Sequence, residues 1–190
     1  MKRIIRSVIF IVLSIFVCRA VIFCYSYPVK YYDIVQENSR KYGVDPMIIM
    51  AIIKAESSFN KYAVSSKNSI GLMQLQENTA SWCALKMGID DFDTSQLYDE
   101  DINIKIGTWY FASFLLGYFD GDITLSLAAY NAGIGNVSNW QKNSEYSSDS
   151  FNLDRIPFPE TENYIKKVYE YYYTYKSMER NIFGMRFSYD

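Results

Sequence analysis

An uninterrupted apolar run, MIIMAII at residues 47–53, sets the first limit on how this chain folds. Asp45 before it is a suitable N-cap and Pro46 a suitable first helical residue, so the run begins a helix. A helix that is apolar on nearly every face has to be enclosed by other elements. We therefore predict that this segment is the buried central helix of the domain, with Glu56 in its last turn.

The rest of the chain after residue 30 also favours helices, because apolar residues recur at helical spacing and no useful strand alternation or repeat is found. Turn-forming residues predict loops at 59–70, with a short irregular hairpin, and at 141–150. The predicted fold class is mostly α. Five further helices are predicted: 31–42 ended by Gly43, 77–87 ended by Gly88, 101–119 capped by Asp101, 123–132 between Asp122 and Gly133, and 161–180.

Composition limits the chemistry that this chain can perform. It has no histidine, so acid and base steps have to use carboxylates. Its three cysteines, Cys18, Cys24 and Cys83, lack the spacing of a zinc site, and we expect neither a metal nor a cofactor. The formal net charge of −2 gives no general attraction to nucleic acid, which is not an expected partner.

Residues 1–27 have the pattern of a membrane-targeting segment. Lys2, Arg3 and Arg6 precede an apolar stretch that Arg19 interrupts, and this stretch is long enough for a signal anchor in the cytoplasmic membrane. Alternatively, it is a signal peptide cleaved after Ala20. Both interpretations put the remaining single domain, residues 28–190, on the extracytoplasmic side, and the first makes the chain a single-pass membrane protein.

Glu56, at the end of the apolar helix, has two interpretations. Acidic residues are mostly exposed, and from its position alone Glu56 is an ordinary surface charge. The alternative is a carboxyl group held against apolar residues, where lost hydration raises the pKa until the group can donate a proton near neutral pH. Cleavage of a glycosidic bond needs an acid of this kind.

Four short motifs occur in a fixed order from Glu56 onward. They are ES at 56–57 followed by Ser65, GLMQL at 71–75, AAYNAG at 128–133 and IPFPET at 156–161. In combination they resemble the lytic transglycosylase family of lysozyme-like enzymes, over about residues 31–173. The resemblance implies a lysozyme-like domain of the type shared by goose-type lysozymes and lytic transglycosylases.

The resemblance also implies roles for individual residues. Glu56 matches the family's catalytic acid and base. The other matched positions are expected to contact or shape the bound glycan. They are Ser57, which completes the ES pair, Ser65 near the substrate's N-acetyl group, Gly71 where the backbone closes on the glycan, Met73 and Gln74 along the groove, Tyr130 close to the catalytic carboxyl, Asn131, Glu160 and the aromatic Tyr164.

The chain departs from the family pattern at a few positions. Lys61 stands where the family commonly has proline, and Gln76 and Glu77 stand where it often has Met-Pro; we include Gln76 among the expected substrate-binding residues. Each motif also has a purely structural interpretation: turn and core for GLMQL, a helix end for AAYNAG, and for IPFPET a loop with Thr161 as N-cap. The tyrosine-rich run at 169–175 is interpreted as structural.

For the reaction, the resemblance implies a scheme with one carboxylate. Glu56 would protonate the bond between N-acetylmuramic acid and N-acetylglucosamine, and would then accept the proton of the muramyl C6 hydroxyl, giving a 1,6-anhydromuramyl end. Asp90, Asp91 and Asp93 are candidates for a second carboxylate, but a solvated acidic loop is the simpler interpretation.

Two other functions remain open from the sequence. A goose-type lysozyme would hydrolyse the same bond with water. An inactive, membrane-anchored scaffold would bind peptidoglycan within the cell-wall, secretion or conjugation machinery. In every case the expected partner is the peptidoglycan glycan strand.

Overall fold

The computed structural model describes residues 2–180; residue 1 and residues 181–190 lie outside the described part, as do the side chains of residues 2–6, 8, 20 and 24. The chain divides into two compact units, residues 1–30 and 31–190, and each is described by itself.

The first unit consists mainly of helix α1, Lys2–Ser26. Among the described residues, no helix combines the length and the apolar character that crossing a membrane requires. The side chains of Lys2, Arg3 and Arg6, on which the targeting prediction depends, lie outside the described part. The membrane anchor therefore stays a prediction.

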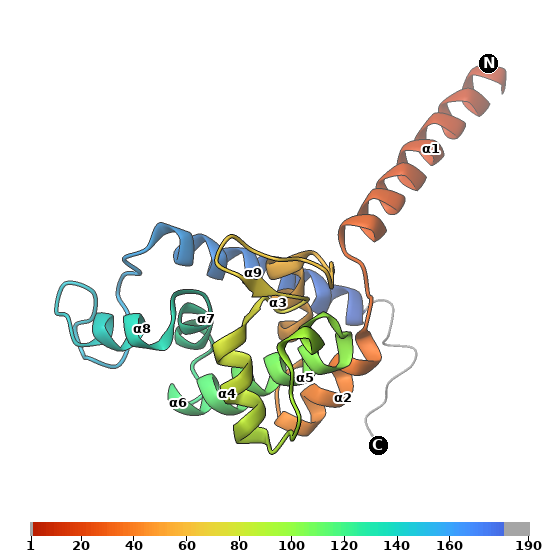
Figure 1. The fold of residues 1–190 in the computed structure, drawn as a ribbon. Coiled ribbons are helices and arrows are strands. Elements are labelled where there is room, and N and C mark those ends of the chain that lie inside the picture. Colours follow the sequence, from red (N-terminus) through yellow and green to blue (C-terminus); the bar gives the residue numbers. More distant parts are fainter. Residues whose placement is uncertain (1, 181–190) are drawn as a thin grey trace. The chain divides into compact units, whose positions relative to one another are not determined.

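The second unit is built around helix α3, Pro46–Ser57. All seven residues of the apolar run are buried, and Ile49 to Ile53 have no exposed surface. The Asp45 side chain caps the helix by accepting a hydrogen bond from the Met47 amide at 2.9 Å. Helix α3 packs most extensively against α9, Pro159–Met178, and also against α2, Tyr32–Tyr42 (Figure 1). The predictions of a buried central helix and a mostly α domain are confirmed.

Helix α5, Glu100–Trp109, packs against α2 and also contacts α4, Glu77–Met87. Between α3 and α4 the chain forms the predicted short hairpin. Strand β1, Ser69–Ile70, pairs antiparallel with β2, Leu75–Gln76, and Val64 forms a further bridge to Ile70. Helix α7, Ile123–Ala132, is capped by Asp122 and ends at Gly133, as expected.

The predicted helix at 101–119 differs from the structure in two respects. Asp99, not Asp101, is its N-cap: Asp99 is extended, with ψ of 129°, and its side chain accepts from the Ile102 amide at 3.0 Å, while Asp101 is already helical. After α5 the helix widens into the π-helical segment η2, Tyr110–Leu115, before the last turn α6, Leu116–Tyr118. A π segment of this kind often accompanies a functional site.

Two short helices were not predicted: the 3-10 helix η1, Thr94–Tyr98, and α8, Ile134–Gln141. Helix α8 contains a glycine and only two buried apolar residues, Val137 and Trp140, so its pattern is weak. The interpretation of Thr161 as N-cap is wrong. Helix α9 begins at Pro159, whose fixed φ suits a first helical turn, so Thr161 lies inside the helix.

Candidate active site

The end of helix α3 presents Glu56 where the chain reverses direction. Ser58 and Phe59 both have positive φ, 51° and 65°, which turns the chain sharply after the helix. The Ser57 hydroxyl donates hydrogen bonds to the Leu72 carbonyl at 2.8 Å and, within the helix, to the Ile53 carbonyl at 3.2 Å. Ser57 therefore fixes the carboxyl end of α3 against the GLMQL segment.

The buried side chain of Asn103 on α5 holds the GLMQL segment in place. Its amide oxygen accepts from the Met73 backbone at 2.8 Å, and its amide nitrogen donates to the carbonyls of Ile70 at 3.0 Å and Leu97 at 2.8 Å. Gly71 has φ of 82°, and a Cβ there would overlap with the Asn103 amide. Glycine at this position is thus required by both its conformation and its contact with Asn103.

Tyr130 joins helix α7 to the same segment. Its hydroxyl donates a 2.6 Å hydrogen bond to the Met73 carbonyl. Its ring is held by Tyr110 and Phe111 of the π-helical segment, with centroid separations of 5.7 Å and 6.2 Å. Tyr130 is thus fixed at both ends, beside the Glu56 carboxyl whose charge acts on it.

The AAYNAG and IPFPET motifs are also in direct contact. The Thr161 hydroxyl donates to the Asn131 amide oxygen at 2.8 Å, which joins the first turn of α9 to the end of α7. Thr161 is buried, while Glu160 beside it is exposed and faces the pocket.

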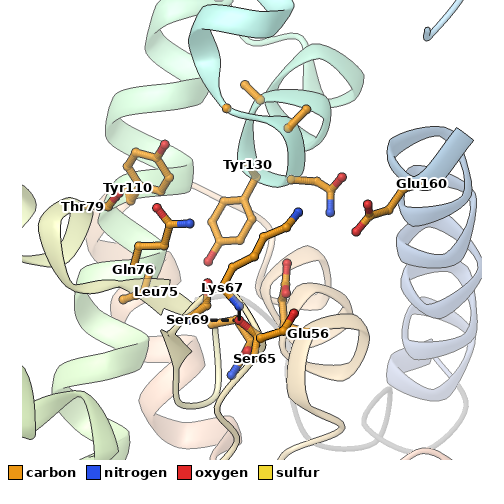
Figure 2. Close-up of a pocket in the computed structure, with 16 residues that line it drawn as sticks. Glu56, Ser65, Lys67, Ser69, Leu75, Gln76, Thr79, Tyr110, Tyr130 and Glu160 are labelled. Carbon is orange, nitrogen blue, oxygen red and sulfur yellow. Dashed lines mark hydrogen bonds between the residues drawn. The ribbon is translucent and has the colours of Figure 1, made fainter. Parts of the chain in front are cut away.

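These elements enclose a pocket of about 430 Å³ (Figure 2). It is lined mainly by polar side chains, which suits a ligand rich in hydroxyl and amide groups. Its lining residues include seven of those expected from the sequence: Glu56, Ser65, Gln74, Gln76, Tyr130, Asn131 and Glu160.

Four expected site residues do not line the pocket. Met73 is fully buried, Gly71 lies against Asn103, and Ser57 binds backbone carbonyls. Tyr164 is buried beside Glu56. In this structure all four lie outside the pocket lining and contact the residues or segments that form it. The alternative acids Asp90, Asp91 and Asp93 do not line it either, and Asp93 caps η1 instead.

The pKa of Glu56 is raised from 4.5 to about 7. The main cause is burial, which removes hydration from the carboxylate form. Two neighbours act in the opposite direction: the Tyr164 hydroxyl and the positive charge of Lys167 each lower the pKa. A carboxyl group with a pKa near 7 can both donate and accept a proton near neutral pH.

Tyr164 is the buried neighbour of Glu56 on α9. Burial, followed by the negative charge of Glu56, raises the pKa of its hydroxyl well above 10, so that it remains a proton donor. Within the described residues this hydroxyl has no hydrogen bond of normal geometry. The two groups are therefore close enough to interact but are not aligned as a hydrogen-bonded pair.

Several residues of the site carried no signal in the sequence. Asn103 is an ordinary polar residue in a helix until its three partners are known. Lys167 is one of several lysines, although its ammonium group donates to the carbonyl of Ala55, next to Glu56, at 3.3 Å. Tyr110 and Thr79 line the pocket from η2 and α4, and Lys67 lines it from the loop before β1.

No group of three or more carboxylate or thiol side chains in the described part of the chain is placed to hold a metal ion. Among the lining residues, the carboxylates are Glu56 and Glu160. The arrangement therefore provides one half-buried acid of raised pKa, a second, exposed carboxylate, and a set of hydrogen-bonding side chains around them.

Known proteins share this arrangement of elements. The family model described as Transglycosylase SLT domain matches residues 33–152. The chain is 34% identical over 153 residues to the soluble lytic murein transglycosylase of Escherichia coli K12, covering 78% of this chain and 24% of that protein. It is 41% identical over 116 residues to the membrane-bound lytic murein transglycosylase C of Shigella sonnei, covering 57% of this chain and 32% of that protein.

Solved structures agree with these relatives. An inactive mutant of the lytic transglycosylase Slt from Pseudomonas aeruginosa matches with a TM-score of 0.70 and 31% identity, over 80% of this chain and 24% of the other. The 70-kDa soluble lytic transglycosylase of Escherichia coli matches with a TM-score of 0.69 and 32% identity, over 80% and 25%. The expected lysozyme-like fold is confirmed, and the chain spans about a quarter to a third of the length of these relatives.

Proposed function

Because the chain belongs to the Transglycosylase SLT domain family, we propose that it is a peptidoglycan lytic transglycosylase with Glu56 as its acid and base. It cleaves the β-1,4 bond between N-acetylmuramic acid and N-acetylglucosamine and leaves 1,6-anhydromuramyl ends. The observation that carries this proposal is a half-buried carboxyl group of raised pKa, about 7, on the wall of a polar pocket.

The reaction uses Glu56 twice. Its protonated carboxyl donates to the glycosidic oxygen, and the bond to the leaving N-acetylglucosamine breaks. The muramyl N-acetyl group stabilises the positive charge that develops at the anomeric carbon. The ionised Glu56 then accepts the proton of the C6 hydroxyl as that oxygen attacks the anomeric carbon. No water is consumed, and Glu56 returns to its protonated form.

The neighbours of Glu56 favour this exchange of roles. Before cleavage, burial raises the pKa of the carboxyl to about 7, so that roughly half of the Glu56 side chains carry a proton at neutral pH. After proton donation, the Tyr164 hydroxyl and the Lys167 charge stabilise the carboxylate until it accepts the second proton. The opposing effects of burial and these two groups place the pKa of Glu56 close to the working pH, as a group that donates and accepts in turn requires.

We assign substrate contacts to the expected residues that line the pocket: Ser65, Gln74, Gln76, Tyr130, Asn131 and Glu160. These side chains offer both donors and acceptors, as the hydroxyl and acetamido groups of a glycan require. Ser57, Gly71 and Met73 act indirectly, by fixing the segment that carries Gln74 and Gln76.

The proposal is tested by mass spectrometry of the fragments that the full chain releases from purified peptidoglycan. We expect products lighter by one water molecule than hydrolytic products, and none from the Glu56→Gln variant. Glu160→Gln is the matched control, because it removes the other carboxylate of the pocket; it should weaken cleavage without abolishing it. Hydrated reducing ends would identify a goose-type lysozyme, and binding without cleavage would identify a scaffold.

We also propose that residues 1–27 hold the domain at the outer face of the cytoplasmic membrane. The basic residues followed by an apolar stretch support this, and so does the similarity to a relative named as membrane-bound. The test is fractionation of cells that produce the full chain, followed by the mass of its N-terminal peptide. Recovery of the domain in the soluble fraction with residues up to Ala20 removed would contradict an anchor.

A further inference from the structure

The loop before strand β1 carries a lysine that the proposed reaction does not use. Residues 65–69 form a tight turn in which the Ser65 hydroxyl accepts hydrogen bonds from the amides of Lys67 at 3.2 Å and Ser69 at 3.0 Å. The Ser65 amide in turn donates to the Ser69 carbonyl at 2.9 Å, and Asn68 adopts a positive φ of 58°. The backbone on both sides of Lys67 is thus fixed by hydrogen bonds.

This turn directs Lys67 toward the pocket. Lys67 lines the same pocket as Glu56, and Figure 2 shows its side chain extending from the turn toward the α7 side. Among the described residues that line the pocket, Lys67 is the one lysine or arginine. It therefore supplies the positive charge of the pocket wall, facing a cavity whose other groups are neutral or acidic.

The Lys67 ammonium group is not engaged by a protein partner in the described part of the chain. Other lysines form ion pairs: Lys61 with Glu100 at 2.6 Å and Lys166 with Glu162 at 2.5 Å. No such pair is found for Lys67 among the described residues, and the cation that acts on Glu56 is Lys167. The charge of Lys67 is therefore available to a ligand in the pocket.

We propose that Lys67 forms an anion subsite that binds a carboxylate on the C3 substituent of the muramyl residue. This inference rests on the proposed function. Ser65 and Lys67 line the same pocket. The family resemblance places Ser65 near the acetamido group on C2 of the sugar, and the longer side chain of Lys67 can reach the substituent on the adjacent carbon, C3. N-acetylglucosamine has no carboxylate, and Lys67 would therefore distinguish the two sugars of the strand and set the register of cleavage.

The carboxylate has two sources in the substrate. In glycan without peptides it is the free lactyl carboxylate of muramic acid. In glycan with peptides the lactyl group is amide-linked, and a carboxylate of the peptide itself takes its place. Both would form the same charge-assisted hydrogen bond with the ammonium group.

The test measures binding, so that it does not depend on turnover. The full chain with Glu56→Gln is titrated calorimetrically with three soluble oligosaccharides of equal length: peptide-free glycan, peptide-bearing glycan and an uncharged chitin oligosaccharide. Each titration is repeated with Lys67→Met, with Lys67→Arg, and with Lys86→Met as a control that removes an exposed lysine of α4 outside the pocket.

Lys67→Met should weaken binding of a carboxylate-bearing glycan about tenfold and leave chitin binding unchanged. Lys67→Arg should retain most of the affinity, and added salt should weaken the parent protein more than Lys67→Met. A loss confined to peptide-free glycan identifies the lactyl carboxylate, and a loss confined to peptide-bearing glycan identifies the peptide. Equal loss for chitin, or no loss for any ligand, overturns the subsite.

Failure of this inference is distinguishable from failure of the proposed function. If the wild-type chain cleaves peptidoglycan with anhydro ends but Lys67→Met binds all three ligands normally, only the anion subsite is wrong. If the wild-type chain cleaves nothing but Lys67→Met selectively loses carboxylate-bearing glycan, the subsite stands and the transglycosylase function is wrong.

Discussion

The hydroxyl of Tyr130 and the backbone carbonyl of Met73 are joined by a 2.6 Å hydrogen bond between residues 57 positions apart. This bond connects helix α7 directly to the GLMQL segment at the pocket wall. Met73 itself is fully buried, so its contribution is made through its backbone, which Tyr130 holds at the carbonyl and Asn103 at the amide. The position of Gln74 and the strand that follows it depends on these two contacts.

Tyr130→Phe should therefore reduce both stability and turnover. The ring still packs against Tyr110 and Phe111, but the Met73 carbonyl loses its partner. We expect a loss of about 1 kcal/mol in unfolding free energy and about a fivefold decrease in kcat/KM. Chemical denaturation and initial rates of peptidoglycan cleavage measure the two effects. Tyr173→Phe, which alters an exposed tyrosine of α9, should change neither. A Tyr130→Phe variant as stable and active as the wild type would contradict this role.

The raised pKa of Glu56 predicts how stability changes with pH. Between 4.5, the value for an ordinary glutamate, and about 7, the folded protein binds a proton that the unfolded chain has released. Stability therefore falls as the pH rises through this range, by roughly 3 kcal/mol at most. Glu56→Gln removes the titrating group. The difference in unfolding free energy between wild type and variant should therefore change over the same pH range, from 4.5 to about 7. A difference that does not change with pH would show that Glu56 has an ordinary pKa.

Activity should show the corresponding dependence, because the first step needs protonated Glu56. We expect kcat/KM to fall as the pH rises above about 7. Lys167→Met should shift this fall to higher pH, since its positive charge lowers the pKa of Glu56. Lys166→Met is the matched control, because Lys166 is the next residue toward the N-terminus but pairs with Glu162 on the exposed surface. A pH–rate profile at low and high salt measures the shift, which should shrink as salt screens the charge. Identical profiles for both variants would exclude a contribution from Lys167.

The sequence predicted well those elements whose ends are determined by residues close together in the sequence. Asp45 and Pro46 define the start of α3, and Gly43, Gly88 and Gly133 end or follow helices because a terminal residue with positive φ favours glycine. The apolar run at 47–53 could only be buried. For the pocket, the order of the motifs identified the residues near Glu56 without any knowledge of their contacts.

The remaining features depend on contacts between residues far apart in the chain. Lys167 meets the end of α3 across 112 positions, and Asn103 meets Ile70 across 33, so neither has a local pattern that marks it. The spacing of apolar residues in the sequence likewise gives no indication that residues 110–115 form a π-helical segment. The error at Thr161 has a different cause: a good capping residue lay two positions after Pro159, which begins the helix.

The contact between Gly71 and Asn103 predicts that two glycine-to-alanine substitutions change the unfolding free energy in opposite directions. Gly71→Ala forces a side chain into positive φ and against the Asn103 amide, which binds Met73, Ile70 and Leu97. We expect a loss of roughly 2 to 4 kcal/mol in unfolding free energy, because strain and a disturbed buried hydrogen-bond network act together.

Gly135→Ala in helix α8 makes the same chemical change where the added Cβ meets open space and φ is not positive. It should stabilise the protein by about 0.5 to 1 kcal/mol, as replacement of a helical glycine by alanine does. Thermal and chemical denaturation of both variants measure these opposite changes in unfolding free energy. At temperatures where the Gly71→Ala variant is still folded, it should cleave peptidoglycan more slowly than the wild type. If Gly71→Ala were as stable as Gly135→Ala, the Asn103 side chain would have to move freely, and it could not be what holds the GLMQL segment beside Glu56.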